Sequence, residues 1–180
     1  MMEKINNMIL RTGRMLCLLV WALVLPGSCI NEEEPIKEVV EVGHRLPDFG
    51  VTMSDGATIT GAMLRTTPSV VMFFHTSCPD CQQTLPRMQR LYDKYANEGV
   101  RFALISREDD EASVAAYWRE HGLTMPYSAQ DDRHIYELFA YRRVPRVYVS
   151  DATGTIRHIF TDDPTPTDEV LDKSVKDVMK

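Results

Sequence analysis

The sequence predicts an α/β fold with a parallel core, because two buried strands alternate with helical segments along the chain. Residues 70–74 and 102–105 are apolar at every position, which is typical of central strands covered on both faces. Between them, apolar residues from 85 to 95 recur at helical spacing. Alternation of strand and helix favours parallel pairing, so we expect residues 70–74 in the middle of the sheet.

The elements in the first half of the domain follow from turn and stop signals. Asp55-Gly56 is a turn dipeptide between short strand-like segments, which predicts an N-terminal β-hairpin. The helix that begins near Cys78 is expected to end at residues 97–99, where Asn-Glu-Gly interrupts the apolar pattern. Pro86 lies inside this helix and is expected to kink it.

The second half of the chain continues the alternation. We expect a helix over 111–121 that ends at Gly122, a short helix over 134–141, and a last helix that begins near Thr167. Residues 146–149 and 156–160 flank a turn-rich link, which predicts an antiparallel hairpin. The expected architecture is therefore a central mixed sheet flanked by helices.

The most informative motif is Cys78-Pro79-Asp80-Cys81, which directly follows the first buried strand. Two thiols at this spacing at a helix start are typical of a redox dithiol. The Cys78 sulfur would lie over unpaired backbone N–H groups at the positive helix end, which favour thiolate. The Asp80 carboxylate opposes this effect, so we expect a less acidic Cys78 and a more reducing couple than a neutral pair would give.

Two other interpretations of the motif stay open. A four-cysteine zinc site lacks ligands, because the other cysteines are Cys17 and Cys29. A thiophilic metal held by His75, Cys78 and Cys81 with one more donor such as His134 is an alternative, and so is an inert structural disulfide. The redox interpretation is preferred, with no metal and no cofactor beyond a Cys78–Cys81 disulfide.

Residues 1–28 are expected to be a targeting segment that is removed. A basic start precedes an apolar run over 15–25 that is too short for a comfortable membrane span. Small residues then lead to Cys29 in a pattern that resembles the lipobox of bacterial lipoproteins, in which the cysteine is lipidated. Pro26 stands where that motif usually has Leu, so ordinary secretory cleavage is the alternative. Either route takes the mature protein out of the cytosol, and we expect it in the cell envelope.

Residues 29–41 are charged and poor in aromatics, which predicts an acidic tether ahead of one domain over 42–180. The acidic run at 32–34 also resembles the export signal of some surface lipoproteins, so a periplasmic and a surface location both stay open. The net charge of the chain is −6, which argues against nucleic acid as a partner.

Several motifs in one order give a family resemblance. Leu46-Pro47-Asp48-Phe49, the apolar strand into the Cys78–Cys81 motif, Pro86, and Val144-Pro145 before a hairpin together resemble thioredoxin-fold proteins. More narrowly they resemble the redoxin-related, membrane-tethered TlpA/ResA group. The resemblance covers roughly residues 42–162, and the longer stretch between Cys81 and Pro145 resembles the helix–strand insertion of that group.

The resemblance implies thiol–disulfide exchange on other proteins. Cys78 would attack a substrate disulfide and Cys81 would resolve the mixed disulfide. Pro145 would be a cis proline packed against the dithiol, and Val144 would offer its backbone to a substrate strand. The implied partners are protein disulfide substrates, a membrane thiol electron donor, and the membrane through the lipid anchor.

Three departures from the family pattern remove usual features of the site. Ser77 stands where a Trp usually precedes the first cysteine, Met72 replaces a buried acid, and Thr84 stands where some relatives have Glu. The usual proton acceptors for Cys81 are therefore missing, and Asp80 or His75 are the candidates to replace them. His75 as a satisfied, partly buried polar residue is the simpler interpretation.

Three arginines, Arg142, Arg143 and Arg146, bracket Val144-Pro145. They would either favour thiolate at the dithiol or form a solvated strand entrance. Peroxiredoxins need a Thr three residues before the reactive cysteine, where this chain has His75, so peroxide reduction is not expected. We expect an envelope oxidoreductase acting as a reductase; the alternatives are a copper-binding module or chaperone and a redox-inactive binding lipoprotein.

Overall fold

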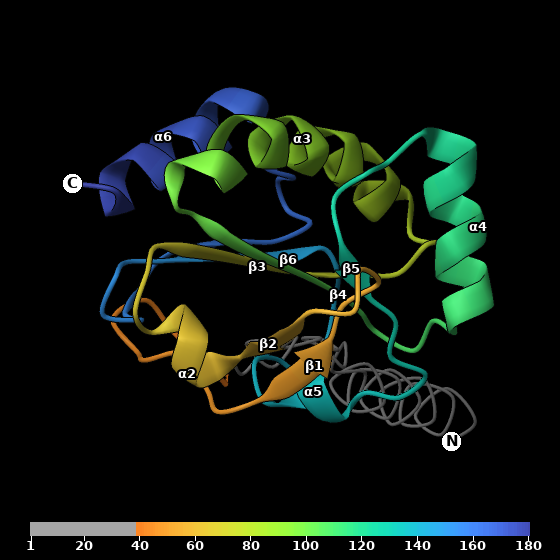
Figure 1. Ribbon diagram of the computed structural model, residues 1–180, viewed down its shortest axis with the longest axis horizontal. Coiled ribbons are helices and arrows are strands. Elements are labelled where there is room, and N and C mark those ends of the chain that lie inside the picture. Colours follow the sequence, from red (N-terminus) through yellow and green to blue (C-terminus); the bar gives the residue numbers. More distant parts are fainter. Residues whose placement is uncertain (1–38) are drawn as a thin grey trace, which may run out of the picture. The chain divides into compact units, whose positions relative to one another are not determined.

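The computed structural model describes residues 39–180, and its centre is a five-stranded sheet (Figure 1). The strand order is β5 (Tyr127–Ser128), β4 (Arg101–Ser106), β3 (Ser69–Phe74), β6 (Arg146–Ser150) and β7 (Ile156–Phe160). β3 pairs in parallel with β4 and antiparallel with β6, and β6 and β7 form the predicted hairpin. The mixed sheet and the central place of β3 are thus confirmed.

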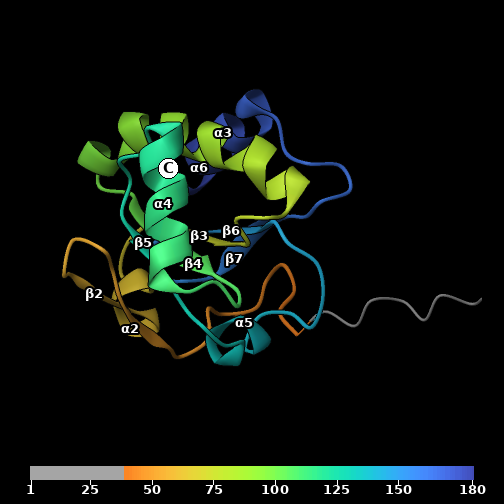
Figure 2. The same ribbon diagram turned by 90° about the vertical axis from the view of Figure 1, so that its right-hand side faces the viewer.

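Helices and a small hairpin cover the two faces of this sheet. α3 (Pro79–Tyr95) and α6 (Asp168–Val178) lie over one face, and α2 (Gly61–Leu64), α5 (His134–Glu137) and the hairpin lie over the other (Figure 1). α4 (Glu111–His121) stands at one side of the domain, in front in the second view (Figure 2). A 3-10 turn, η2 (Ala96–Glu98), follows α3 and ends at Gly99, as the sequence predicted.

The N-terminal hairpin is present and forms a separate two-stranded sheet. β1 (Gly50–Thr52) pairs antiparallel with β2 (Thr58–Thr60). In the turn, Gly56 has a φ of 84° and the Asp55 carboxylate accepts the Ala57 N–H at 2.9 Å. This is why the Asp-Gly pair signals a turn: glycine tolerates a positive φ and aspartate satisfies a free N–H.

The helix ends follow ordinary capping chemistry. Asp110 accepts the Ser113 N–H at the start of α4, and Gly122 takes a left-handed conformation at its end. Thr167 caps α6 in the same way. The predicted bounds of α4 and the predicted start of α6 are confirmed. α3 continues through Pro86 without ending there.

The helix expected over 134–141 is shorter than predicted, because α5 ends at Glu137. Leu138 N–H bonds to Ile135 O at 3.3 Å and Phe139 N–H bonds to Tyr136 O at 2.9 Å, so the last turn tightens to i→i+3 bonding. Tyr136 and Phe139 are both buried, which fixes the chain here before it turns toward the next strand.

The core divides at β3 because neighbouring strand residues face opposite sides. The Phe73 ring contacts Tyr136 and Phe139, with centroid distances of 5.4 and 4.8 Å. Phe74 packs instead against Trp118 of α4 at 5.1 Å. β3 is therefore buried on both faces, as its continuous apolar sequence predicted.

Residues 1–38, including the predicted targeting segment, Cys29 and most of the acidic tether, lie outside the described residues. Within residues 39–180, the helices are too short or too polar to cross a membrane.

Candidate active site

The two cysteines of the motif lie where β3 passes into α3. Cys78 is the N-cap residue of α3 and Cys81 lies in its first turn; both are free thiols. Cys78 is partly exposed, whereas Cys81 is fully buried. The solvent-accessible Cys78 is therefore suited to attack a substrate disulfide, and the shielded Cys81 is suited to resolve the mixed disulfide.

The loop before β6 supplies the partner of Cys78. The Val144–Pro145 peptide bond is cis, as the resemblance implied. The Cys78 thiol donates a hydrogen bond to the Val144 carbonyl oxygen, at 3.3 Å from Sγ. Cys78 lies at the N-terminus of α3, as predicted, but its side chain makes no capping hydrogen bond there; its partner is the Val144 carbonyl of the loop before β6.

Burial raises the pKa of the Cys81 thiol well above its usual range, and contact with the Cys78 thiol acts in the same direction. A hydrogen bond from the His75 backbone and the positive charge of Arg107 act against this rise without cancelling it. Burial disfavours the charged form of any thiol. Cys81 is thus held as a neutral thiol at physiological pH.

The positions that lack the family acids are filled by residues that cannot take up a proton. Met72 is fully buried in β3. Thr84 is also fully buried, and its hydroxyl donates to the Asp80 carbonyl at 2.7 Å, as a helical Thr can. Asp80 lies in the first turn of α3, where a carboxylate favours the helix, and its effect on the couple stays a prediction.

A buried carboxylate that the sequence reasoning missed lies next to the dithiol loop. Asp109, three residues beyond β4, accepts the Thr76 N–H at 2.6 Å with Oδ2. Its Oδ1 lies 3.4 Å from His75 Nε2. His75 is thus partly buried, with Nδ1 within 2.9 Å of the Ser77 hydroxyl and Nε2 facing the Asp109 carboxylate.

The sequence carried a usable signal for Asp109. Ligands and catalytic groups gather beyond the carboxyl ends of parallel strands. β3 and β4 are such neighbours, so the acidic residues just after β4 had to lie near those just after β3. Arg107 and Tyr117 were also missed; burial raises the pKa of Tyr117, and the nearby Cys81 sulfur adds to the rise.

The three arginines around the cis-proline loop differ from one another. Arg142 is exposed, while Arg143 lies 3.6 Å from an Asp162 carboxylate oxygen. Arg146 was expected to be solvated or to face the dithiol, and the solvated interpretation is wrong because it is 1% exposed. Its Nε donates to the Arg142 carbonyl at 3.1 Å, and its charge acts on the buried Tyr136.

The metal interpretation required His75, both cysteines and a further donor to come together. Within residues 39–180, no group of three or more His, Cys, Asp or Glu side chains is placed to hold a metal ion. The proposed fourth donor, His134, is exposed and pairs with Asp132 at 2.6 Å. Its pKa is raised by that hydrogen bond.

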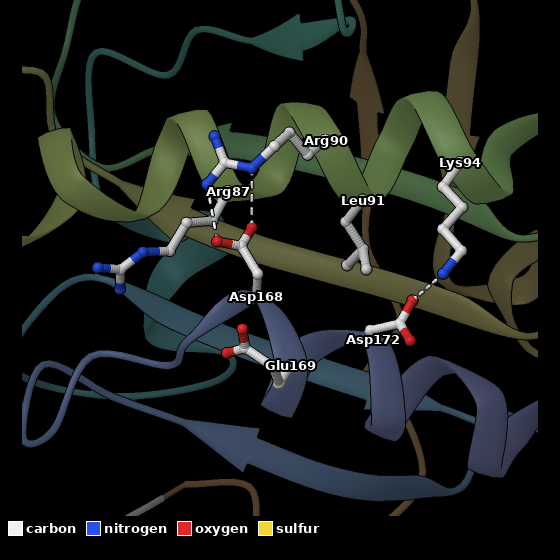
Figure 3. Close-up of a pocket in the computed structure, with 7 residues that line it drawn as sticks. All are labelled: Arg87, Arg90, Leu91, Lys94, Asp168, Glu169 and Asp172. Carbon is white, nitrogen blue, oxygen red and sulfur yellow. Dashed lines mark hydrogen bonds and ion pairs between the residues drawn. The ribbon is translucent and has the colours of Figure 1, made fainter.

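A groove between α3 and α6 lies outside the dithiol site and is closed by ion pairs (Figure 3). The Arg90 guanidinium donates to both Asp168 oxygens, at 2.8 and 2.9 Å, and Lys94 pairs with Asp172. In Figure 3, Arg90 and Lys94 of α3 point at Asp168 and Asp172 of α6, whereas Arg87 points away and donates to the Pro166 carbonyl at 2.8 Å. The ion pairs therefore hold the two helices together, and the residues that line the groove offer no group suited to redox chemistry.

Comparison with known proteins agrees with this geometry. The chain is 25% identical over 167 residues to the thiol-disulfide oxidoreductase ResA of Geobacillus kaustophilus, covering 93% of this chain and 94% of that one. A thioredoxin-family thiol:disulfide interchange protein from Chlorobium tepidum matches with a TM-score of 0.67 and 22% identity, over 78% and 99% of the chains. A secreted Mycobacterium tuberculosis disulfide oxidoreductase matches with a TM-score of 0.63 and 22% identity, over 72% and 96%.

These structures share the thioredoxin-like fold with this chain. The AhpC/TSA family matches residues 42–159, a span that holds the hairpin, the dithiol and the cis-proline loop. The chain therefore belongs to the AhpC/TSA family and has a thioredoxin-like fold.

Proposed function

We propose that this protein is a thiol–disulfide oxidoreductase that reduces disulfides of other proteins through Cys78 and Cys81. The observation that carries the proposal is the pairing of an accessible Cys78 with a fully buried Cys81 beside the cis-proline loop. Relatives named thiol-disulfide oxidoreductase over nearly the whole chain support it.

The reaction runs in two exchanges. The Cys78 thiolate attacks one sulfur of a substrate disulfide; that S–S bond breaks, and the leaving thiolate takes up a proton. Cys81 then loses its proton and attacks the Cys78 sulfur, which releases the second substrate thiol. The substrate gains two electrons and two protons, and the protein keeps a Cys78–Cys81 disulfide.

We further propose that the protein works in the cell envelope, anchored through a lipid on Cys29 and kept reduced by a membrane thiol donor. The targeting segment, the small residues before Cys29 and the secreted relative support this placement. Substrates would be proteins with accessible disulfides.

The test is insulin reduction by the purified protein in the presence of dithiothreitol. Cys78→Ser should abolish the activity. Cys81→Ser, incubated with insulin without dithiothreitol, should leave a mixed disulfide between Cys78 and the substrate, visible on a non-reducing gel. Equal activity in Cys78→Ser and wild type would refute the proposal. A reduction potential near −270 mV supports a reductase, and one near −120 mV an oxidant.

A further inference from the structure

A chain of polar contacts leads from Asp109 to the residue before Cys78. Asp109 Oδ2 accepts the Thr76 N–H at 2.6 Å, and Oδ1 lies 3.4 Å from His75 Nε2. On the other side of the ring, His75 Nδ1 accepts the Ser77 N–H at 3.2 Å and lies 2.9 Å from Ser77 Oγ. All three residues between β3 and Cys78 are thus tied, directly or through the imidazole, to one carboxylate.

Asp109 itself is held beside the end of β4. Asp109 is 6% exposed, and its carbonyl accepts the Ser106 hydroxyl at 3.1 Å. Asp109 also forms a β-bridge with Gln130, whose N–H donates to the same Ser106 hydroxyl at 2.7 Å. A buried carboxylate without donors would be costly, so the two contacts to the loop are needed for its burial as well as for the loop.

The hydrogen bonds decide which imidazole nitrogen carries the proton in the neutral ring. Nδ1 accepts the Ser77 N–H and therefore has no proton of its own. The proton of the neutral ring then lies on Nε2, facing the Asp109 carboxylate. A carboxylate behind an imidazole fixes the orientation of the ring, and here the ring in turn holds Ser77.

We propose that Asp109 is a positioning residue for the dithiol, acting through His75 and through the Thr76 N–H. It holds residues 75–77 so that the Cys78 sulfur stays against the Val144 carbonyl, aligned for attack on a disulfide. Ser77 is small and exposed, so the segment has little packing of its own to hold it there. This inference rests on the proposed function, whose site it describes in more detail.

The experiment compares two reactions of Cys78 in the reduced full-length protein. Exchange with oxidised glutathione needs three sulfurs in line: Cys78 attacks one sulfur, the S–S bond breaks, and one glutathione leaves with a proton. Cys81 then displaces the second glutathione, which leaves a protein disulfide and two glutathione thiols. Alkylation by iodoacetamide consumes the same thiolate but makes smaller demands on alignment. The ratio of the two rate constants therefore reports positioning separately from thiolate content.

Three variants separate the contacts. Asp109→Ala removes the hydrogen bond to the Thr76 N–H and the contact with His75, and it should lower the exchange-to-alkylation ratio about tenfold, because a lost charge-assisted hydrogen bond has this order of effect. Asp109→Asn keeps an oxygen for the Thr76 N–H and should recover part of the loss. His75→Asn keeps an acceptor for the Ser77 N–H and loses the nitrogen that faces Asp109, so its effect should not add to that of Asp109→Asn.

A neighbouring acid supplies the matched control. Asp110→Ala removes the N-cap of α4, where the carboxylate accepts the Ser113 N–H at 2.8 Å. It should lower stability by about 1 kcal/mol and leave the ratio within twofold of wild type. An unchanged ratio in Asp109→Ala, or an equal fall in Asp110→Ala, would overturn the inference. If the wild type fails to reduce insulin, the proposed function is refuted but the positioning role of Asp109 is not. The ratio of glutathione exchange to alkylation is measured without any protein substrate.

Discussion

The buried Cys81 thiol should make the reduced protein less stable as the pH rises into the alkaline range. Its pKa lies well above the ordinary value of 9.0 because the side chain is fully buried. In the unfolded chain the same thiol ionises near pH 9, so above this pH the unfolded state binds fewer protons than the folded state. Linkage then requires the free energy of unfolding to fall as pH rises.

The size of the fall follows from the unfolded pKa alone while the folded thiol stays neutral. Ionisation in the unfolded state stabilises it by RT ln(1 + 10^(pH − 9.0)). Between pH 8 and pH 10 this amounts to about 1.4 kcal/mol for one thiol. This loss of stability is negligible well below the unfolded pKa, and it does not occur in the oxidised protein, which has no Cys81 thiol.

The assay is urea unfolding of the reduced protein at pH 8, 9 and 10 with a phosphine reductant present. Cys81→Ala is the control, because it keeps every other titrating group and removes only this one. The wild type should lose about 1.4 kcal/mol more than Cys81→Ala between pH 8 and 10. The same pH dependence in both proteins would show that Cys81 ionises in the folded state, which the burial argument forbids.

Two further predictions concern packing. Gly61→Ala should lower the free energy of unfolding in urea by at least about 2 kcal/mol, because the new Cβ would lie 2.1 Å from the Pro47 carbonyl oxygen. Gly50→Ala is the control: its nearest atom would be 3.8 Å away, so it should cost less than about 1 kcal/mol. Equal costs for the two variants would contradict the clash. Ser69→Ala should cost about 1–3 kcal/mol, since it leaves the Ser150 hydroxyl, now 2.6 Å away, buried without its partner. Replacing both serines by Ala should cost less than the sum of the single changes, and strict additivity would count against this explanation.

Local chemistry explains what could be predicted from the sequence. The continuous apolar run of β3, the Asp-Gly turn, the caps at Asp110 and Thr167, and the glycine that ends α4 all act within a few residues. Each depends on periodicity or on backbone conformation, which neighbours along the chain determine. The same holds for the two cysteines, whose spacing places them at one helix start.

Predictions failed where a residue's surroundings come from distant segments. Arg146 begins a strand and carries a charge, yet it is buried and acts on Tyr136, which lies ten residues earlier in another element. The end of α5 at Glu137 depends on the packing of Tyr136 and Phe139 against β3. No local pattern records that packing.

The sequence by itself determined the order of the elements, the dithiol and the cis-proline position that the family resemblance implied. Only the tertiary structure decided which groups surround the sulfurs. Antiparallel pairing of β3 with β6 brings the Val144 carbonyl to Cys78, and parallel pairing of β3 with β4 brings Asp109 to His75. These neighbours are separated by 66 and 34 residues, so the sheet topology, and not local spacing, places them together.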